Sequence, residues 1–149
     1  MSRPELIAIE PDEYHASHCG VTSEGKQYFL TTLFEHAIEG KEGCEYVALF
    51  LFDQEGNIIE SKTVIESFGP RITVNDLEVS LRIKALLISL GETQTSRIEI
   101  RPFQINKFGT KFGFLARSPE EEDDEWAVEL MPGNYMAFFE PWDSGEYDT

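Results

Sequence analysis

The residue types best suited to chemistry gather near the N-terminus, in the segment His15-Ala-Ser-His-Cys19. Imidazole and thiolate are ligands that zinc prefers, and a thiolate beside a histidine can also act as a nucleophile. On a strand His15 and His18 would point to opposite faces, so they share a face only if the segment is helical or turned. Zinc also needs a third and usually a fourth ligand, and only His36 and Cys44 remain as soft candidates. No orienting group can be placed beside a nucleophilic Cys19. We therefore expect ordinary, partly exposed histidines, with no metal, no cofactor and no catalytic residue.

A second chemical feature is a run of six consecutive carboxylates that follows Pro119 and leads directly into Trp126. Like charges in a row repel one another, so the run is expected to be a solvated loop. It lacks the spaced ligands and the central glycine of a calcium loop. Two interpretations stay open, a plain solvated connector and one part of a binding surface.

The C-terminal segment 141–149 is again acidic and aromatic. If the last strand pairs with the strand at 126–130 across the Pro132-Gly133 turn, this tail and the acidic loop emerge at the same end of the sheet. Acidic groups would then speed encounter with a basic protein, and aromatic groups would anchor it. Alternatively, Trp142 and Tyr147 fold back and clamp the tail onto the domain; we favour the clamp for Trp142 and the interface for the carboxylates around it. The candidate partner-binding residues are Glu120, Glu121, Glu122, Asp123, Asp124, Glu125, Trp126, Trp142, Asp143, Glu146 and Tyr147.

The usual catalytic signatures are absent from the sequence. It contains no phosphate loop, no Gly-x-Ser-x-Gly elbow, no His-Glu-x-x-His and no dinucleotide fingerprint. The segment Phe108-Gly-Thr-Lys-Phe-Gly113 has glycines without cradle spacing, and it is predicted to be a hairpin.

Strands are predicted along most of the chain. Tyr46–Phe52 is apolar at every position, which is typical of a central strand with both faces covered. A turn at 53–57 should return the chain into a less buried strand at 58–65, and Ser67–Pro70 should break the sheet. Further strands are expected at 6–9, 27–34, 97–101, 126–130 and 135–139. The fold predicted is α+β in one domain, residues 1–149, with a mainly antiparallel sheet of about 6–9 strands and an acidic tail at about 141–149.

One principal helix is predicted over about 76–90. Asn75 is a good N-cap, and Gly91 is a natural C-terminal stop. A clean apolar stripe has the spacing i, i+4, i+7 and i+11, although the first half of the segment also alternates as a strand would. The stripe consists of Val79, Ile83, Leu86 and Leu90, widened by Leu87.

A second apolar stripe, Leu77, Leu81 and Ile88, lies on nearly the opposite side of this helix. A helix packed on one sheet needs only one apolar side. We expect another segment, such as the N-terminal one, to cover the second stripe. The alternative is an interface with a partner or with a second copy in a homodimer.

The overall charge narrows the classes of partner. The 149 residues include 12 basic and 28 acidic groups, a formal charge of −16. Such a charge repels nucleic acid and anionic membrane surfaces, and there is no apolar run of membrane length. The N-terminus lacks a signal-peptide pattern, and Cys19 and Cys44 do not form a disulfide framework. We therefore expect a cytoplasmic protein that binds neither nucleic acid nor membrane.

The termini resemble a family of short acidic bacterial proteins that carry the label formate hydrogenlyase regulatory protein. The resemblance rests on four segments, and the last is the most specific: Met1-Ser-Arg-Pro-Glu-Leu-Ile-Ala-Ile with Asp12-Glu-Tyr-His, Arg97-Ile-Glu-Ile-Arg-Pro-Phe103, the acidic loop, and Glu140-Pro-Trp-Asp-Ser-Gly-Glu-Tyr-Asp-Thr149. It implies transcriptional or complex-level regulation of hydrogenase maturation.

The expected function is a non-enzymatic regulatory or protein-interaction domain. The chain has no recognisable helix-turn-helix and no basic stripe, so regulation should proceed through protein contact. One alternative is an immunity-type inhibitor of a basic toxin, and another is a small hydrolase with an unrecognised carboxylate site.

Overall fold

In the residues that it describes, the computed structural model of this protein contains twelve strands, one α-helix and a short 3₁₀ helix. The structure describes residues 4–13, 16–37, 40, 42–70, 73–121, 125–133, 136–142 and 145–147, the last three by their backbone only. The strands are β1 (Ile7–Ile9), β2 (His18–Thr22), β3 (Gln27–Glu35), β4 (Cys44–Phe52), β5 (Val64–Gly69), β6 (Thr93–Thr95), β7 (Ile98–Ile100), β8 (Ile105–Lys107), β9 (Thr110–Arg117), β10 (Ala127–Met131), β11 (Met136–Phe138) and β12 (Gly145–Tyr147). The α-helix α1 spans Asp76–Ser89, and the 3₁₀ helix spans Glu60–Lys62.

The strands form two five-stranded sheets and a two-stranded one. The first sheet has the order β5-β4-β3-β2-β6, the second β12-β11-β10-β9-β8, and β1 pairs with β7. Every pairing is antiparallel, which confirms the predicted class. The prediction of one sheet of about 6–9 strands is wrong, because the described residues contain more strands and divide them among three sheets. Several of them are three-residue edge strands, too short to show a periodic pattern.

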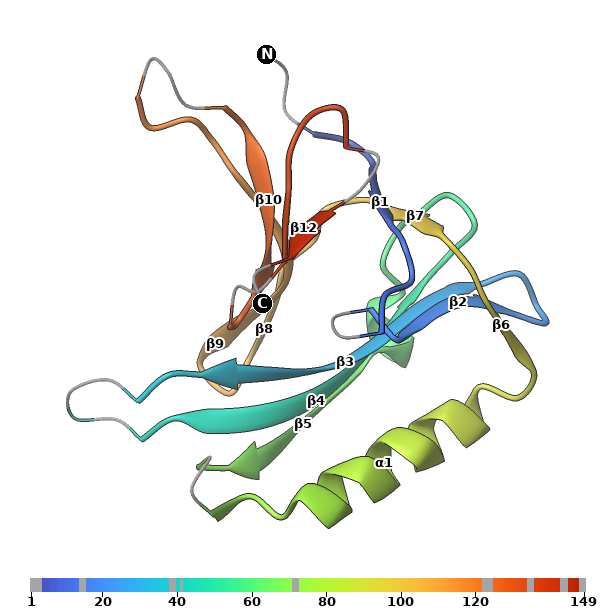
Figure 1. Cartoon of the computed structure of the whole chain (residues 1–149), viewed down its shortest axis with the longest axis vertical. Coiled ribbons are helices and arrows are strands. Elements are labelled where there is room, and N and C mark those ends of the chain that lie inside the picture. Colours follow the sequence, from blue (N-terminus) through green and yellow to red (C-terminus); the bar gives the residue numbers. More distant parts are fainter. Residues whose placement is uncertain are drawn as a thin grey trace.

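The main core lies between the two large sheets. Phenylalanine rings from both sheets meet there: Phe29 of β3 and Phe114 of β9 are 5.6 Å apart between ring centroids, and Phe114 is 5.9 Å from Phe138 of β11. Figure 1 shows α1 on the far side of the first sheet, away from β8–β12. The molecule therefore has three layers: α1, the first sheet and the second sheet.

Strand β4 has both faces covered, as its uniform apolar sequence predicts. Ala48, Phe50 and Phe52 belong to the core between the sheets. The alternate residues Val47, Leu49 and Leu51 pack in a second cluster, to which α1 contributes Leu86. This arrangement explains why every position from Tyr46 to Phe52 is apolar.

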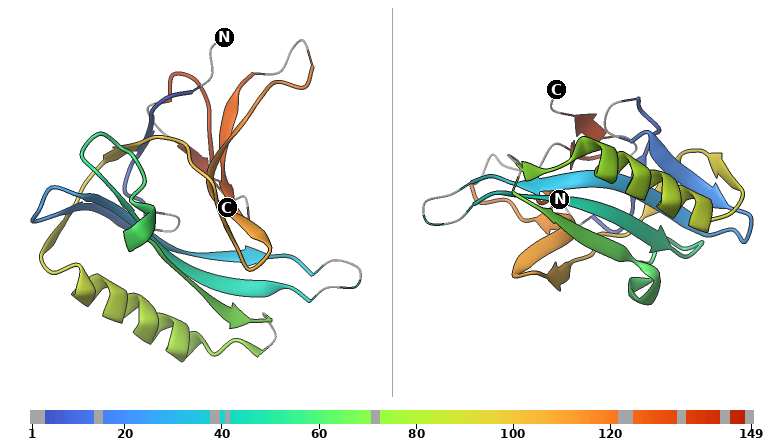
Figure 2. Two further views of the ribbon diagram at one scale, coloured as in Figure 1. Left: turned by 180° about the vertical axis from the view of Figure 1, so that it is seen from behind. Right: turned by 90° about the horizontal axis from the view of Figure 1, so that it is seen from below.

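Helix α1 begins at the predicted cap. The side-chain oxygen of Asn75 accepts hydrogen bonds from the backbone N–H groups of Leu77 (2.9 Å) and Glu78 (3.3 Å). Gly91 has a φ of 74°, the left-handed conformation expected just after a helix. The helix lies along the first sheet (Figure 2), and the guanidinium of Arg82 forms an ion pair with Glu66 of β5. The predicted stripe is confirmed as the inner face: Leu86 is buried in the cluster with β3 and β4, and the partly buried Val79, Ile83, Leu87 and Leu90 pack against that cluster.

The region after β4 differs from the prediction. The turn begins as expected, since the Asp53 carboxylate accepts from the N–H groups of Glu55 and Asn57, both at 2.9 Å. However, only an isolated bridge links Phe52 with Ile58, and the 3₁₀ helix interrupts the predicted strand. Strand β5 then runs through the segment Ser67–Gly69, where a break in the sheet was predicted. Gly69 ends this edge strand with a φ of 87°, a conformation that glycine adopts without steric cost because it has no Cβ.

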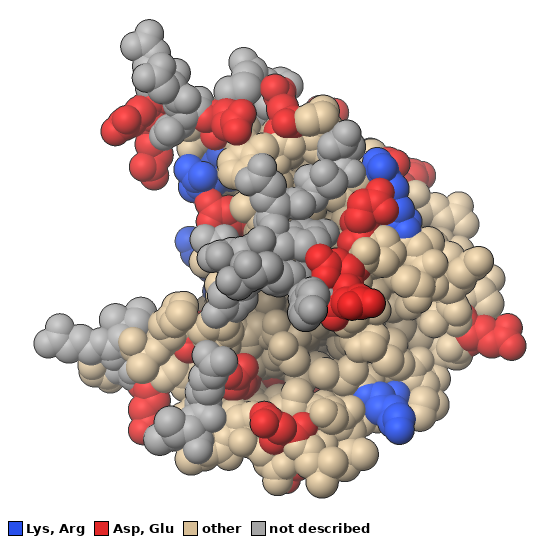
Figure 3. Space-filling model, viewed as in Figure 1, with Lys and Arg blue, Asp and Glu red and all other residues tan. Residues whose placement is uncertain are grey.

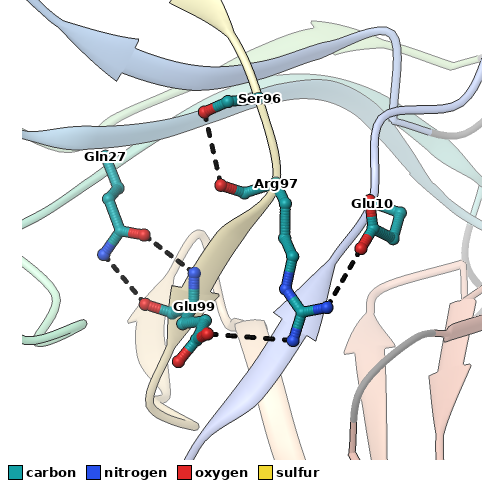
Figure 4. Close-up of polar contacts among 5 residues, drawn as sticks. All are labelled: Glu10, Gln27, Ser96, Arg97 and Glu99. Atoms are coloured by element: carbon teal, nitrogen blue, oxygen red, sulfur yellow. Dashed lines mark hydrogen bonds and ion pairs between the residues drawn. The ribbon is translucent and has the colours of Figure 1, made fainter.

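Strand β7 is fixed to the first sheet by a buried side chain, Gln27 of β3 (Figure 4). The Gln27 amide nitrogen donates to the carbonyls of Glu99 (2.8 Å) and Asp53 (3.1 Å), and its oxygen accepts from the Glu99 N–H (2.8 Å). Arg97 adds ion pairs to Glu10 beside β1 (3.2 Å) and to Glu99 (3.7 Å). The bonds between Gln27 and Glu99 and the ion pair between Arg97 and Glu10 join segments that lie more than seventy residues apart in the sequence.

Candidate interaction surfaces

The acidic loop connects β9 to β10, whose paired ends are Arg117 and Ala127. Glu120, Glu121 and Glu125 are exposed, and Trp126, which follows directly, is half-buried. The predicted residues Glu122, Asp123 and Asp124 lie outside the described residues. In Figure 1, β9 and β10 carry this connection to one extremity of the molecule.

The tail folds back onto the second sheet. The backbone of β12 pairs with β11, with Gly145 opposite Phe138 and Tyr147 opposite Met136. The acidic loop leads into the start of β10, where Val128 is opposite Phe138. The loop is therefore near the Phe138 end of β11, and Tyr147 is at the Met136 end. The structure therefore carries Tyr147 away from the loop. Asp143 lies outside the described residues, and Glu146 and Tyr147 are placed by backbone alone.

Trp142 occupies the turn before β12 and ties it to the N-terminal strand. The backbone N–H of Trp142 donates to the Phe139 carbonyl (2.7 Å), and the backbone carbonyl of Trp142 accepts from the Ala8 N–H of β1 (2.9 Å). The indole is half-buried against the core between the sheets. Its backbone φ of 68° is rare for a residue with a bulky side chain. Such a conformation carries a strain of about 1–3 kcal/mol, which the surrounding contacts must offset. These contacts are those expected of a clamp.

The outer face of α1, formed by Leu77, Leu81 and Ile88, is open to solvent. The exposed fractions of these side chains are 66%, 57% and 73%. The expectation that another segment covers them is wrong for the described part of the chain, because the N-terminal strand β1 pairs with β7 instead. The alternative, an interface with a partner or a second copy, stays a prediction.

A cavity of about 310 Å³ opens where β3 ends and β4 begins, and no sequence pattern predicted it. Its described lining residues are Phe34, Glu35, His36, Ala37, Glu42, Gly43 and Pro70. The ring of His36 meets the ring of Phe34 edge-on at 4.7 Å between centroids. The only sequence signal was the pair of acidic residues, Glu35 and Glu42, that flank the expected loop at 39–43.

Glu35 has structural partners on the side away from this opening. Its carboxylate accepts hydrogen bonds from the Tyr46 hydroxyl (3.1 Å) and from the Thr110 hydroxyl of β9. Burial raises the pKa of Tyr46, so this hydroxyl stays protonated and donates at neutral pH. Glu35 thus links β3, β4 and β9, which fixes one wall of the cavity.

A second cavity, of about 240 Å³, lies beside the C-terminal end of α1 and contains Lys26 and Lys62. The Lys26 ammonium contacts the Glu24 carboxylate at 2.7 Å, and this hydrogen bond raises the pKa of Lys26. Cations beside a helix C-terminus are favoured by the helix dipole. These lysines are explained by that location, and we assign them no ligand.

The histidine and cysteine segment has a structural role at the positions that are described. His18 and Cys19 lie in β2, and burial lowers the pKa of His18. Burial, reinforced by Glu10, raises the pKa of the Cys19 thiol to about 11, so it stays neutral near pH 7 and is a poor nucleophile. Among the described residues no three His, Cys, Asp or Glu side chains group as metal ligands, and His15 lies outside them.

Comparisons with protein-family models, with curated proteins and with solved structures find no match to this chain. In the part of the chain that the structure describes, no helix is both long and apolar enough to cross a membrane.

Proposed function

We propose that this protein is a non-enzymatic regulatory domain that binds a basic protein partner through its acidic loop. The observation that carries the proposal is the exposure of the described carboxylates Glu120, Glu121 and Glu125, the last of which directly precedes the half-buried Trp126. Carboxylates raise the rate of encounter with a basic surface, and an aromatic side chain beside them supplies contact area. We propose that this takes place in the cytoplasm, in keeping with two free cysteines.

The charge of the whole molecule supports the choice of a basic partner. On the face in Figure 3, acidic side chains are spread widely and basic ones are few. With a formal charge of −16, an acidic partner or a nucleic acid would be repelled over the range of a Debye length, about 8–10 Å at physiological salt. A regulator with this surface would act by protein contact. The resemblance of the termini to the formate hydrogenlyase regulatory proteins implies regulation at the level of transcription or of a protein complex.

A charge-neutralising variant tests the proposal. The triple substitution Glu120→Gln, Glu121→Gln, Glu125→Gln should reduce recovery of basic proteins in a pull-down at low salt, and high salt should reduce recovery by the native protein. The matched control is Glu55→Gln, Glu60→Gln, Glu92→Gln, which removes three exposed carboxylates elsewhere. Equal recovery by the two variants, or retention of the partner at high salt, would sink the proposal.

An immunity-type inhibitor of a basic toxin is the second candidate, because it would use the same acidic surface. The identity of the partner separates the two: a regulator should recover a component of a regulatory complex, and an immunity protein a toxin whose activity it abolishes. The neighbouring genes provide the same distinction.

The hydrolase alternative has one specific observation in its favour, the two carboxylates of the cavity, Glu35 and Glu42. We do not adopt it, because the Glu35 carboxylate accepts two hydrogen bonds that join strands.

A further inference from the structure

The outer face of α1 carries a row of four side chains whose spacing is the same in both directions. The row consists of Leu77, Leu81, Lys84 and Ile88. The intervals of four, three and four residues keep the row on one side of the helix, as in the seam of a coiled coil. The three apolar members are largely exposed, and so is Lys84. A row that is unchanged on reversal has the symmetry that a two-fold contact between identical copies requires.

Two copies can join these rows when their helices run antiparallel. A two-fold axis through the middle of the row places Leu77 opposite Ile88 of the second copy, and Leu81 opposite its Lys84. The apolar stem of this lysine then covers the leucine. The Lys84 ammonium comes within one helical turn of the Glu78 carboxylate of the second copy. Symmetry forms this ion pair twice, once on each side of the axis.

Helix α1 is also the element through which a like-charged copy meets little repulsion. The chain has a formal charge of −16, but within α1 the acidic Asp76 and Glu78 are balanced by the basic Arg82 and Lys84. Helix α1 lies at the opposite end of the molecule from the ends of β9 and β10 that carry the acidic loop (Figure 1 and Figure 2). A contact through α1 therefore leaves both acidic loops on the outside of the pair.

The charge within the row favours a second copy over the basic partner as the occupant of this face. Lys84 is exposed in the row and would repel a basic surface. In the described part of the chain Lys84 has no ion-pair partner, so its ammonium is available to another molecule. A second copy offers it the exposed Glu78 carboxylate together with an apolar row of matching spacing.

We propose that two copies of this protein associate through the outer faces of their α1 helices, antiparallel and related by a two-fold axis. Leu77, Leu81 and Ile88 supply the apolar contact, and the two ion pairs between Lys84 and Glu78 fix the register. The contact is limited to a helix of 14 residues, about 21 Å long, which is at the low end of interface sizes. We therefore expect a dissociation constant of about 0.1 mM. The inference does not depend on what the acidic loop binds.

Charge-reversed variants test the register. The Lys84→Glu variant would bring carboxylates together across the two-fold axis, and the Glu78→Lys variant would bring ammonium groups together. Each variant alone should dimerise about tenfold more weakly than the native protein, because two exposed ion pairs are replaced by two repulsive contacts. An equimolar mixture should recover association of about native strength, because each mixed pair again contains two lysine–glutamate contacts. Sedimentation equilibrium in moderate salt, which screens the overall repulsion, measures the association.

A second variant tests the apolar contact. Leu81→Gln with Ile88→Gln should be monomeric at about 0.1 mM protein, where the native protein is partly dimeric. Phe108→Gln is the matched control, because it removes an exposed apolar side chain from the turn between β8 and β9. This control should dimerise as the native protein does. Far-UV circular dichroism checks that each variant retains its fold.

Three results would each overturn the inference. The first is a native protein that stays monomeric at about 1 mM. The second is a mixture of the charge-reversed variants that associates no better than either variant alone. The third is a dimer that persists in the variant of Leu81 and Ile88.

The same samples separate this inference from the proposed function. The triple loop variant leaves α1 intact, so it should dimerise as the native protein does even where it loses the basic partner. If the native protein is monomeric and the variant of Leu81 and Ile88 loses the basic partner, the outer face of α1 belongs to that partner and the inference fails.

Discussion

At the scale of single residues, Gln27 shows how one buried amide can determine the position of a distant strand. Its three hydrogen bonds reach the N–H and the carbonyl of Glu99 and the carbonyl of Asp53, which also accepts from the Gly56 N–H at 3.1 Å. Gln27→Leu should lower the free energy of unfolding by about 3 kcal/mol, because buried polar groups lose their partners. Chemical denaturation measures the change.

The matched control is Gln94→Leu in the exposed edge strand β6, which should stay within about 0.5 kcal/mol of the native protein. If the two substitutions have the same effect on the free energy of unfolding, Gln27 does not fix β7.

The two cysteines should differ in reactivity because of their surroundings. Cys19 is buried with a pKa of about 11, and Cys44 is partly exposed beside the Ser67 hydroxyl, at 3.1 Å. At about pH 8, iodoacetamide should modify Cys44 first and reach Cys19 only after unfolding. Peptide mass spectrometry measures the order, and early modification of Cys19 in the native protein would contradict it.

The raised pKa of Cys19 also has a consequence for stability in alkali. The unfolded thiol ionises near its ordinary pKa of 9.0, while the folded thiol does so only near 11. The stabilisation is therefore complete below pH 9.0 and is lost as the pH rises toward 11. Cys19→Ala should remove this part of the alkaline loss in a series of melting curves; an unchanged pH profile would count against it.

At the scale of elements, the two faces of α1 should respond differently to substitution. Leu81→Gln with Ile88→Gln changes the exposed face and should leave the free energy of unfolding within about 1 kcal/mol of the native value. Leu86→Ala changes the buried face and should cost about 2–5 kcal/mol. Thermal melting compares the two.

The same double variant tests the predicted contact on the outer face of α1. Native and variant proteins should differ in mass in solution if the face holds a second copy, and light scattering measures this. An unfolded double variant would show instead that the face is covered within the chain.

At the scale of the whole molecule, the charge of −16 acts on every part of the fold at once. Self-repulsion among 28 acidic groups destabilises the folded state, and salt screens it. Moderate salt should therefore raise the melting temperature at neutral pH. Calorimetry at a series of salt concentrations measures the melting temperature. The salt should not be a sulfate, because sulfate also stabilises proteins by exclusion from their surface. A melting temperature unchanged or lowered by salt would contradict the prediction.

The sequence by itself determined the features that depend on neighbouring residues. Asn75 and Gly91 mark the ends of α1, and the uniform apolar run of β4 shows that both of its faces are covered. The acidic row before Trp126 likewise indicated an exposed connection. Each of these signals arises within a few residues, from a cap, a period or mutual repulsion, so it can be read without knowing the fold.

The tertiary structure alone decided which distant segments meet. The pairing of β1 with β7 left the outer face of α1 uncovered, and the pairing of β12 with β11 carried Tyr147 away from the acidic loop. The cavity depends on the approach of Gly43 to the Glu35 backbone and on the bond from Thr110 in the other sheet. Backbone hydrogen bonds between strands are alike for nearly all residues, so local pattern does not specify the partner strand. Side-chain packing across the whole core makes that choice.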